Sequence, residues 1–269
     1  MLDDLRLVAI VVVAAVGSMV NSIAGGGTLL TFPSLIALGI SPIVANATST
    51  VALWPGALGS MYGYRRRLVG AGRWAAVFAV PSLIGGAGGA LLLLSTPPRH
   101  FDVIVPWLVL GATAIFALQG PVARRLRRTA EAGSRAAAAG TAQGVRGPRF
   151  TASTLLWQFL VGIYGGYFGA GIGILMLAVL GIMGFSDIHQ MNGLKNWGGL
   201  CINFMPALLF AVSGIVDWAV ALAMAVGATA GGYVASRAAQ RVPQAVVRRA
   251  VVVIGVVSGL WLLWGRLAA

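Results

Sequence analysis

The sequence predicts an all-α, polytopic membrane protein composed of two inverted repeats of about five helical segments each, including one short or broken helix per repeat. Three observations support this fold class: an apolar composition, an internal repeat and an uneven distribution of arginine. Of the 269 residues, 58% are hydrophobic and 9% are charged, and the mean hydropathy is +0.89. A soluble domain usually carries about 25% charged residues, so lipid must be the main solvent of this chain.

The internal repeat relates residues 17–46 to residues 162–192, with one residue inserted in the second copy. Each copy passes from an apolar segment into a glycine-rich break and then into a short apolar segment that ends in Gly-Ile-Ser or Gly-Phe-Ser. A second apolar helix follows, opening with Asn46 in one copy and Asn192 in the other. Related halves in an apolar chain are typical of transporters whose substrate site lies where the halves meet.

The apolar stretches define five expected segments in each half. They cover residues 5–24, 27–40, 43–64, 73–95 and 101–119 in the first half, and residues 151–169, 172–184, 190–213, 217–236 and 244–265 in the second. The second segment of each half has about 14 residues and would span about 20 Å as a helix, less than the hydrocarbon core of a bilayer. We expect it to be a tilted partial crossing or one arm of a broken helix.

Arginine clusters predict the orientation of these segments. The clusters are Arg65, Arg66 and Arg67; Arg124, Arg125, Arg127, Arg128, Arg135, Arg146 and Arg149; and Arg237, Arg241, Arg248 and Arg249. The positive-inside rule places all three in the cytoplasm. Ten segments satisfy this rule, with both termini outside and the halves in opposite orientation. Counting each short segment with its neighbour gives eight crossings and leaves the last cluster outside, so we favour ten.

These features divide the chain into a first membrane repeat at residues 1–119, a basic cytoplasmic linker at residues 120–149 and a second membrane repeat at residues 150–269. The linker is rich in Ala, Gly and Arg and has no apolar face, so we expect a flexible segment. A role as a topological anchor is favoured over binding of anionic lipid. Nucleic acid is not an expected partner, because no aromatic residue interleaves these arginines.

The glycine breaks are the first candidate for a binding site. They contribute Gly25, Gly26, Gly27 and Thr28 in the first half, and Gly169, Gly171 and Gly173 in the second. Each break exposes the N-terminal amides of a short helix inside the membrane, and these amides and the helix dipole favour an anion. Close packing of helices on small residues is the alternative explanation.

Two polar stripes, one in the third segment of each half, are the second candidate. Their members are Asn46, Thr48 and Ser49 in the first half, and Asn192, Lys195 and Asn196 in the second. Hydrogen bonding between helices is the alternative role for the uncharged members. Lys195 is the only lysine of the chain, and it either snorkels from the start of its helix or faces an anion.

No catalytic, metal or cofactor site is expected, so the chain is not predicted to be an enzyme. The six carboxylates, Asp3, Asp4, Asp102, Glu131, Asp187 and Asp217, all lie at or beyond segment ends. His100, His189 and Cys201 complete the titratable side chains that such a site would use. They form neither a nucleophile with its base nor a set with metal-ligand spacing.

The patterns N-S-I-A-G-G-G-T-L-L-T-F-P at residues 21–33 and G-I-S-P-I-V-A-N-A-T-S-T at residues 39–50 resemble the sulfite exporter TauE/SafE family of membrane permeases. G-A-G-I-G at residues 169–173 and M-N-G-L-K-N at residues 191–196 resemble that family's second repeat. The resemblance covers nearly the whole chain outside the linker. It implies transport of sulfur oxyanions or sulfonates such as sulfite, sulfoacetate or thiosulfate. The second break lacks the hydroxyl of Thr28, so the half-sites are not expected to contribute equally.

The expected function is therefore export of a small sulfur-containing anion across the bacterial inner membrane, by alternating access at a midplane site between the repeats. An inside-negative potential drives anions outward by about 2.3 kcal/mol per charge per 100 mV, and no mid-membrane carboxylate is seen that would couple a cation. The expected partners are membrane lipid and the transported anion, which is sulfite or an organosulfonate. A homo-oligomer is a further possibility. The alternative is a channel-like facilitator for a small neutral solute or another inorganic anion.

Overall fold

The structure is a computed structural model that describes residues 4–65, 72–118, 120, 149–185, 187–238 and 244–267. These residues form ten α-helices and no strand. The first half contains α1 (Asp4–Ala24), α2 (Thr28–Ala37), α3 (Pro42–Tyr64), α4 (Gly72–Ser95) and α5 (Pro98–Ala117). The second contains α7 (Ala152–Tyr167), α8 (Ile172–Ile182), α9 (Ile188–Ser213), α10 (Trp218–Ala238) and α11 (Gln244–Leu267). The all-α, polytopic fold class is confirmed.

Six of the described helices are long and apolar enough to cross a membrane: Leu5–Ile23, Gly72–Ser95, Pro98–Ala117, Gln190–Ser213, Trp218–Ala235 and Val246–Arg266. Their outward faces carry exposed apolar side chains such as Trp107 and Trp264, which is the pattern expected for contact with lipid. The short helices α2 and α8 have 10 and 11 residues. They span about 15–17 Å, so neither crosses a bilayer alone.

The two short helices end two or three residues earlier than the apolar patterns predict. Gly39 follows α2 with φ +87°, and Gly184 follows α8 with φ +91°. A glycine in this left-handed conformation is a common way to end a helix, because it lets carbonyls of the last turn accept amides from the following residues. The amide of Gly39 donates to the Ile36 carbonyl at 2.9 Å, and that of Gly184 to the Gly181 carbonyl at 3.1 Å.

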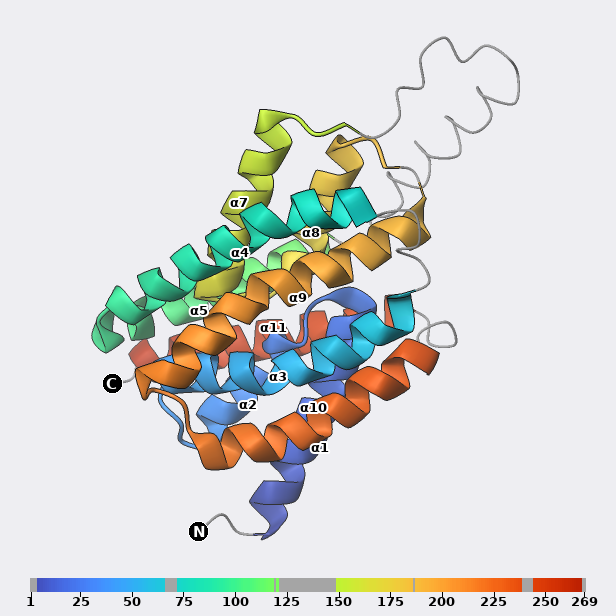
Figure 1. The fold of residues 1–269 in the computed structure, drawn as a ribbon. Coiled ribbons are helices and arrows are strands. Elements are labelled where there is room, and N and C mark those ends of the chain that lie inside the picture. Colours follow the sequence, from blue (N-terminus) through green and yellow to red (C-terminus); the bar gives the residue numbers. More distant parts are fainter. Residues whose placement is uncertain are drawn as a thin grey trace, which may run out of the picture.

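The helices of one half pack mainly against helices of the other. α1 packs along α10 and α4 along α7, while α3 contacts α10 and α9 contacts α4; α3 also meets α9, and α5 meets α11. Exchanging the halves converts four of these pairs into one another and leaves the α3–α9 and α5–α11 pairs unchanged, which a two-fold relation between repeats would produce. In Figure 1, α3 and α9 run in opposite directions, as do α4 and α10. This arrangement agrees with inverted repeats, and their inverted relation stays a prediction.

Glycine-lined contacts bring these helices together. A methyl carbon placed on Gly85 of α4 would lie 2.9 Å from Gly162 Cα of α7, so the two backbones touch. Gly227 and Gly231 of α10 lie in the same way against backbone atoms of α1. Small residues allow such close approach between helices inside a membrane. The halves are therefore joined by close contacts between helix backbones.

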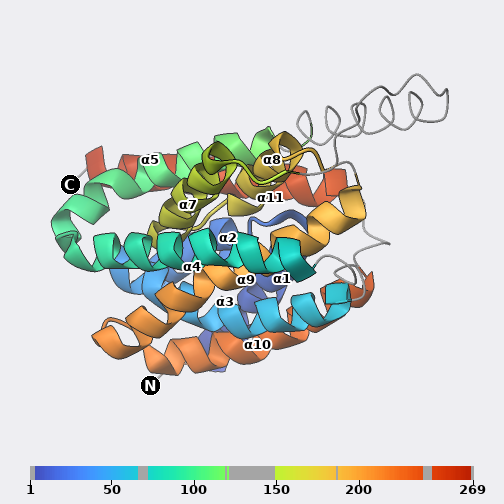
Figure 2. The same cartoon turned by 45° about the horizontal axis from the view of Figure 1, so that its top comes forward.

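One end of the helix bundle carries most of the described arginines, and we call it the basic end. α3 ends there at Arg65, α4 begins there beside Arg73, Arg149 precedes α7, and α11 begins there with Arg248 and Arg249. Figure 2 shows the start of α1 and the end of α11 toward the other end, which we call the far end. Residues 121–148, most of the predicted linker, lie outside the described residues, as do Arg66, Arg67 and Arg241.

Candidate functional site

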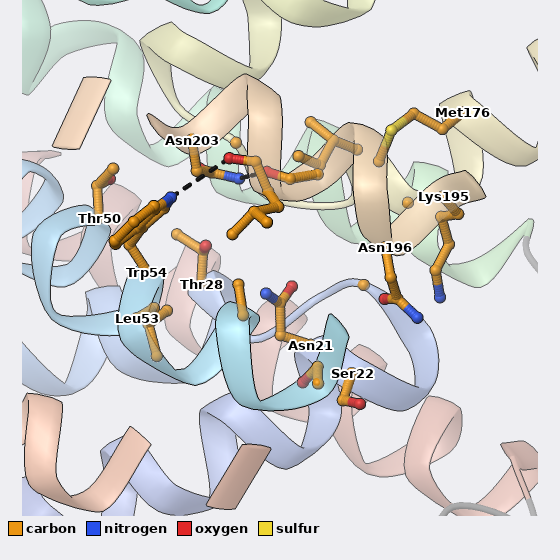
Figure 3. A pocket seen from close by; sticks show the side chains of 18 of the residues that line it. Asn21, Ser22, Thr28, Thr50, Leu53, Trp54, Met176, Lys195, Asn196 and Asn203 are labelled. Atoms are coloured by element: carbon orange, nitrogen blue, oxygen red, sulfur yellow. Dashed lines mark hydrogen bonds between the residues drawn. The ribbon is translucent and has the colours of Figure 1, made fainter. Parts of the chain in front are cut away.

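A polar cavity of about 50 Å³ lies between the two halves. It has room for a few water molecules or one small ion. Its lining residues come from α1, the first glycine break, α2 and α3 on one side, and from the second break, α8 and α9 on the other (Figure 3). They are Asn21, Ser22, Gly25, Thr28, Thr50, Leu53, Trp54, Ala57, Ser60, Phe168, Gly169, Ile172, Gly173, Met176, Lys195, Asn196, Gly199, Leu200 and Asn203.

The two glycine breaks meet at the wall of this cavity. Gly25 has φ +81°, and a methyl carbon placed on it would lie 2.9 Å from Gly173 Cα and 3.3 Å from Gly173 N. Any side chain at Gly25 would therefore be strained by the backbone conformation and would collide with the second break. The contact brings the start of α2 and the start of α8 to the same cavity.

Both short helices begin without a side-chain cap. Neither Gly27, which precedes α2, nor Gly171, which precedes α8, provides a side-chain hydrogen bond to the first turn. By contrast, α7 is capped by Thr151, whose hydroxyl accepts from the Thr154 amide at 3.2 Å. The first amides of a helix have no acceptor within it, and the helix dipole makes this end electropositive. Two uncapped N-termini at one cavity favour an anionic ligand.

Lys195 adds a full positive charge to the same space. Its side chain is 3% exposed and belongs to the cavity wall, where Figure 3 shows it pointing, with Asn196, toward the end of α1. It makes no hydrogen bond or ion pair to any residue that the structure describes, and no cavity-lining residue is acidic. A buried ammonium group is costly unless an anion or a set of acceptors compensates it.

Two further polar groups of the cavity wall have no hydrogen-bond partner among the described residues. They are the Ser22 hydroxyl and the Asn196 side-chain NH2, and both are buried. Buried polar groups are nearly always hydrogen-bonded in native proteins. The NH2 group is only a donor, and the hydroxyl can also donate. Lys195 and the Asn196 NH2 group require hydrogen-bond acceptors, and the Ser22 hydroxyl can use one; an oxyanion supplies them.

The rest of the wall mixes polar side chains, such as Asn21, Thr28 and Asn203, with apolar and aromatic ones. Trp54 lines the cavity, donates from Nε1 to the Leu200 carbonyl at 3.3 Å, and packs on Phe204 with ring centroids 5.5 Å apart. Phe168 is held by an edge-to-face contact with Phe32 at 5.3 Å. The cavity therefore offers two aromatic side chains in addition to its hydrogen-bonding groups.

The structure brings together some of the residues predicted from sequence. Gly25, Thr28, Gly169, Gly173, Lys195 and Asn196 line the cavity. The remaining break glycines pack elsewhere: Gly26 against the Phe116 ring, Gly27 against the Gly17 backbone and Gly171 near the Ala112 carbonyl. These three glycines are closely packed against other parts of the protein, which is the alternative role that the sequence left open.

In this structure the polar stripe of α3 makes hydrogen bonds between helices, which is the alternative role that the sequence left open. Asn46 donates from Nδ2 to the Tyr167 carbonyl at 2.9 Å, the Thr48 hydroxyl accepts the Asp217 amide at 3.0 Å, and Ser49 pairs with Thr31 at 2.6 Å. None of the three lines the cavity, and neither does the half-buried Asn192. Thr50, Leu53 and Trp54 occupy the cavity face of α3 instead.

Sequence reasoning missed Asn21 and Ser22 as cavity residues. Both stand in the last turn of α1, immediately before the first glycine break. Polar residues at the end of an apolar helix, next to a break inside the membrane, were the available signal. Trp54 both lines the cavity and packs against Phe204.

Comparison with known proteins identifies the family. The family model described as sulfite exporter TauE/SafE matches residues 9–262. The chain is 29% identical to the probable membrane transporter protein YfcA of Escherichia coli K12, over 98% of this chain and 92% of the relative. It is 27% identical to a probable membrane transporter protein of Haemophilus influenzae, over 90% and 88% of the two chains.

A third relative, probable membrane transporter protein ORF9 of a Sinorhizobium species, is 28% identical over 96% of this chain and 93% of its own length. No solved structure matches the chain. The match to the family model extends over nearly all of the sequence, including both glycine breaks and the helices that enclose the cavity. The chain therefore belongs to the sulfite exporter TauE/SafE family and is a membrane transporter.

Proposed function

We propose that the protein exports a small sulfur-containing anion, such as sulfite, sulfoacetate or another sulfonate, and binds it in the cavity between its halves. The observation that carries this proposal is the convergence of two uncapped helix N-termini and Lys195 on one cavity, whose wall has no acidic residue among those that the structure describes. The substrate class follows from the description of the family.

The anion oxygens accept hydrogen bonds from Lys195 and from the Asn196 side chain. Further donors are the first amide of α2, that of Thr28, and the first two amides of α8, because the amides that follow donate to carbonyls of the glycine breaks. Thr28, Gly25, Gly169 and Gly173 shape the adjoining wall. Charge-assisted hydrogen bonds of this kind are stronger than neutral ones. An organic substituent on a sulfonate packs against the aromatic side chains of Trp54 and Phe168.

Export agrees with the charge of the cavity. The membrane potential drives a monovalent anion out of a cell by about 2.3 kcal/mol per 100 mV. Uptake of the same anion requires a coupling cation, and the cavity wall contains no carboxylate to bind one. We propose that the basic end faces the cytoplasm of a bacterial inner membrane, as the positive-inside rule requires.

A flux assay tests this function. Purified protein is reconstituted into liposomes loaded with labelled sulfite or sulfoacetate, and efflux is followed at clamped membrane potentials. We expect efflux that an inside-negative potential accelerates, that other oxyanions inhibit by competition, and that Lys195→Met suppresses. Thr229→Ala is the matched control, because the Thr229 hydroxyl bonds only within its own helix, to the Ala225 carbonyl at 2.7 Å, and is exposed. Flux of a neutral solute without voltage dependence would identify the facilitator alternative instead.

A further inference from the structure

Lys195 is the one charged side chain in the cavity wall, among the residues that the structure describes. It stands in the second turn of α9, close enough to the basic end for a long side chain to reach water. Its side chain is instead 3% exposed and lines the cavity, beside Asn196 and directed toward the end of α1 (Figure 3). The described part of the wall therefore carries one positive charge.

The described carboxylates lie too far away to neutralise this charge. Asp187 is exposed and lies eight residues before Lys195, which is about 12 Å along the helix. Asp4, Asp102 and Asp217 lie at or just before helix starts at the far end, and α9 runs about 27 Å from Lys195 to its last residue near that end. Exposed charges at more than about 8–10 Å are largely screened by salt. Within the described residues, only a bound anion can compensate Lys195.

The helix N-termini at the cavity do not change this count of charge. A helix dipole places about +0.5 charge at the N-terminus and about −0.5 at the C-terminus, so α2 and α8 stabilise a nearby anion but add no net charge. Ser22 and Asn196, whose hydroxyl and NH2 groups are buried without a partner among the described residues, are also uncharged. A singly charged anion beside Lys195 therefore brings the net charge of the cavity to zero.

The presence of the anion decides how costly it is to close the cavity. When the cavity closes around a singly charged anion, the ion pair with Lys195 replaces the hydration that both ions lose. When it closes without an anion, the ammonium group loses water and gains no partner, which is strongly destabilising. A cavity of about 50 Å³ has room for only a few water molecules in place of the anion. The empty carrier should therefore switch between its two open states more slowly than the loaded carrier.

We propose that the protein exchanges singly charged anions across the membrane without moving net charge, which rests on the alternating access and the anion cavity of the proposed function. Lys195 neutralises the anion during each crossing, in either direction. An anion that leaves the cell is replaced in the cavity by one from outside, and the carrier returns loaded. Export without exchange uses the slower return of the empty carrier.

The membrane potential then acts on only one part of the transport cycle. The empty carrier has one positive charge, so an inside-negative potential favours its return from the outward-open to the inward-open state. The carrier loaded with a singly charged anion has no net charge, so the potential does not act on it. Net export still moves one negative charge outward in each cycle, because the positive charge of Lys195 moves inward on the return. Exchange moves none.

Tracer efflux from liposomes measures this exchange. The parent protein is reconstituted, loaded with labelled methanesulfonate, which is a singly charged sulfonate, and diluted into either unlabelled methanesulfonate or gluconate, which is larger than the small ion that the cavity admits. We expect efflux into methanesulfonate to be at least about tenfold faster, a factor that corresponds to about 1.4 kcal/mol of barrier. An inside-negative potential should accelerate efflux into gluconate and leave efflux into methanesulfonate unchanged.

Sulfoacetate is the matched probe in the parent protein, because its sulfonate and carboxylate groups give it two negative charges. The carrier loaded with sulfoacetate has one net negative charge, so each exchange includes one crossing against the field. We expect a potential of about 100 mV of either sign to slow sulfoacetate exchange by about three- to fourfold, for a barrier midway across the field. Methanesulfonate exchange in the same liposomes should not slow.

Lys195→Met lowers the charge of every state by one. The variant loaded with methanesulfonate has one negative charge, and the empty variant has none. At concentrations raised to offset weaker binding, methanesulfonate exchange should become as sensitive to potential as sulfoacetate exchange is in the parent. External methanesulfonate should no longer accelerate efflux. Lys195→Arg keeps the charge and should behave as the parent does.

The outcomes separate the exchange from the proposed function. Efflux of sulfite or a sulfonate that depends on Lys195, but that the same anion outside does not accelerate, overturns the exchange and leaves the proposed function standing. Methanesulfonate exchange that slows at both signs of potential in the parent overturns it as well. Absence of any sulfite or sulfonate flux contradicts the proposed function and the exchange together.

Discussion

Replacing Lys195 by methionine should have opposite effects on anion binding and on the stability of the empty protein. Lys195 is 3% exposed, lines the cavity and has no partner among the described residues. A hydrogen bond to a charged group contributes about 1.5–3 kcal/mol, which corresponds to about a 10- to 100-fold change in Kd. Titration of purified protein with sulfite, sulfoacetate, thiosulfate and sulfate should therefore show Kd values raised by this factor for every anion that the parent binds.

The stability of the anion-free variant should change in the other direction. Most substitutions of buried residues lower stability, but an unpaired buried ammonium group carries a desolvation penalty that a methionine of similar length does not. A gain of about 1 kcal/mol raises Tm by about 2–4 °C in a protein of this size class. Thermal unfolding in detergent, in a buffer free of oxyanions, measures this change. Lys195→Arg is the control, because it keeps the charge.

Two results would refute the reasoning about Lys195. Unchanged Kd values in Lys195→Met would mean that the ammonium group does not contact the anion. A Tm that falls in the anion-free Met variant, as it does for ordinary core substitutions, would mean that Lys195 is compensated in the empty cavity. Either result removes the main electrostatic argument for an anion site between the halves.

Three further predictions use matched positions in the chain. Gly25→Ala should lower stability by at least about 1 kcal/mol more than Gly39→Ala. Both residues have φ above +80°, but only Gly25 meets the second glycine break. Thermal unfolding checks this prediction, and equal losses of stability in the two variants would contradict it. Gly86→Ala should unfold or loosen the protein, because a methyl carbon on Gly86 would overlap a carbonyl of α9. Gly88→Ala should be tolerated, because a methyl carbon on Gly88 has its nearest neighbour at 3.9 Å. Size-exclusion profiles and melting curves distinguish the two variants. Saturating sulfoacetate should slow reaction of Lys195 with an amine-reactive ester but leave the N-terminal amine unaffected, as read by mass spectrometry of the digested chain; equal protection of both amines would argue against a bound anion at the cavity.

The helices could be predicted closely because hydropathy and breaks are local properties. Each of the ten expected segments corresponds to one described helix, and their ends agree within a few residues. The differences at α2 and α8 arise where Gly39 and Gly184 end the helix inside an apolar stretch. A glycine within an apolar run does not reveal its φ angle, because the same residue also occurs inside packed membrane helices.

The candidate site was predictable in part for the same reason. A glycine break is recognisable within a few residues, and so is a single lysine in an apolar helix, and both lie at the cavity. The face that α3 turns toward the cavity was not predictable. Asn46, Ser49 and Thr50 are neighbours in the sequence, yet only Thr50 lines the cavity, because the rotation of α3 about its axis is decided by its packing against α9 and α10.

The sequence by itself determined that this chain is a membrane protein, that it has two related halves with a short segment after a glycine break in each, and which residues interrupt the helices. These properties depend on transfer free energies and backbone preferences that act within one segment. Only the tertiary structure decided that Gly25 meets Gly173, that Lys195 faces a cavity without a counter-charge, and that Asn46 holds the Tyr167 carbonyl. Such contacts join residues more than a hundred positions apart, so they exist only after the two halves have packed together.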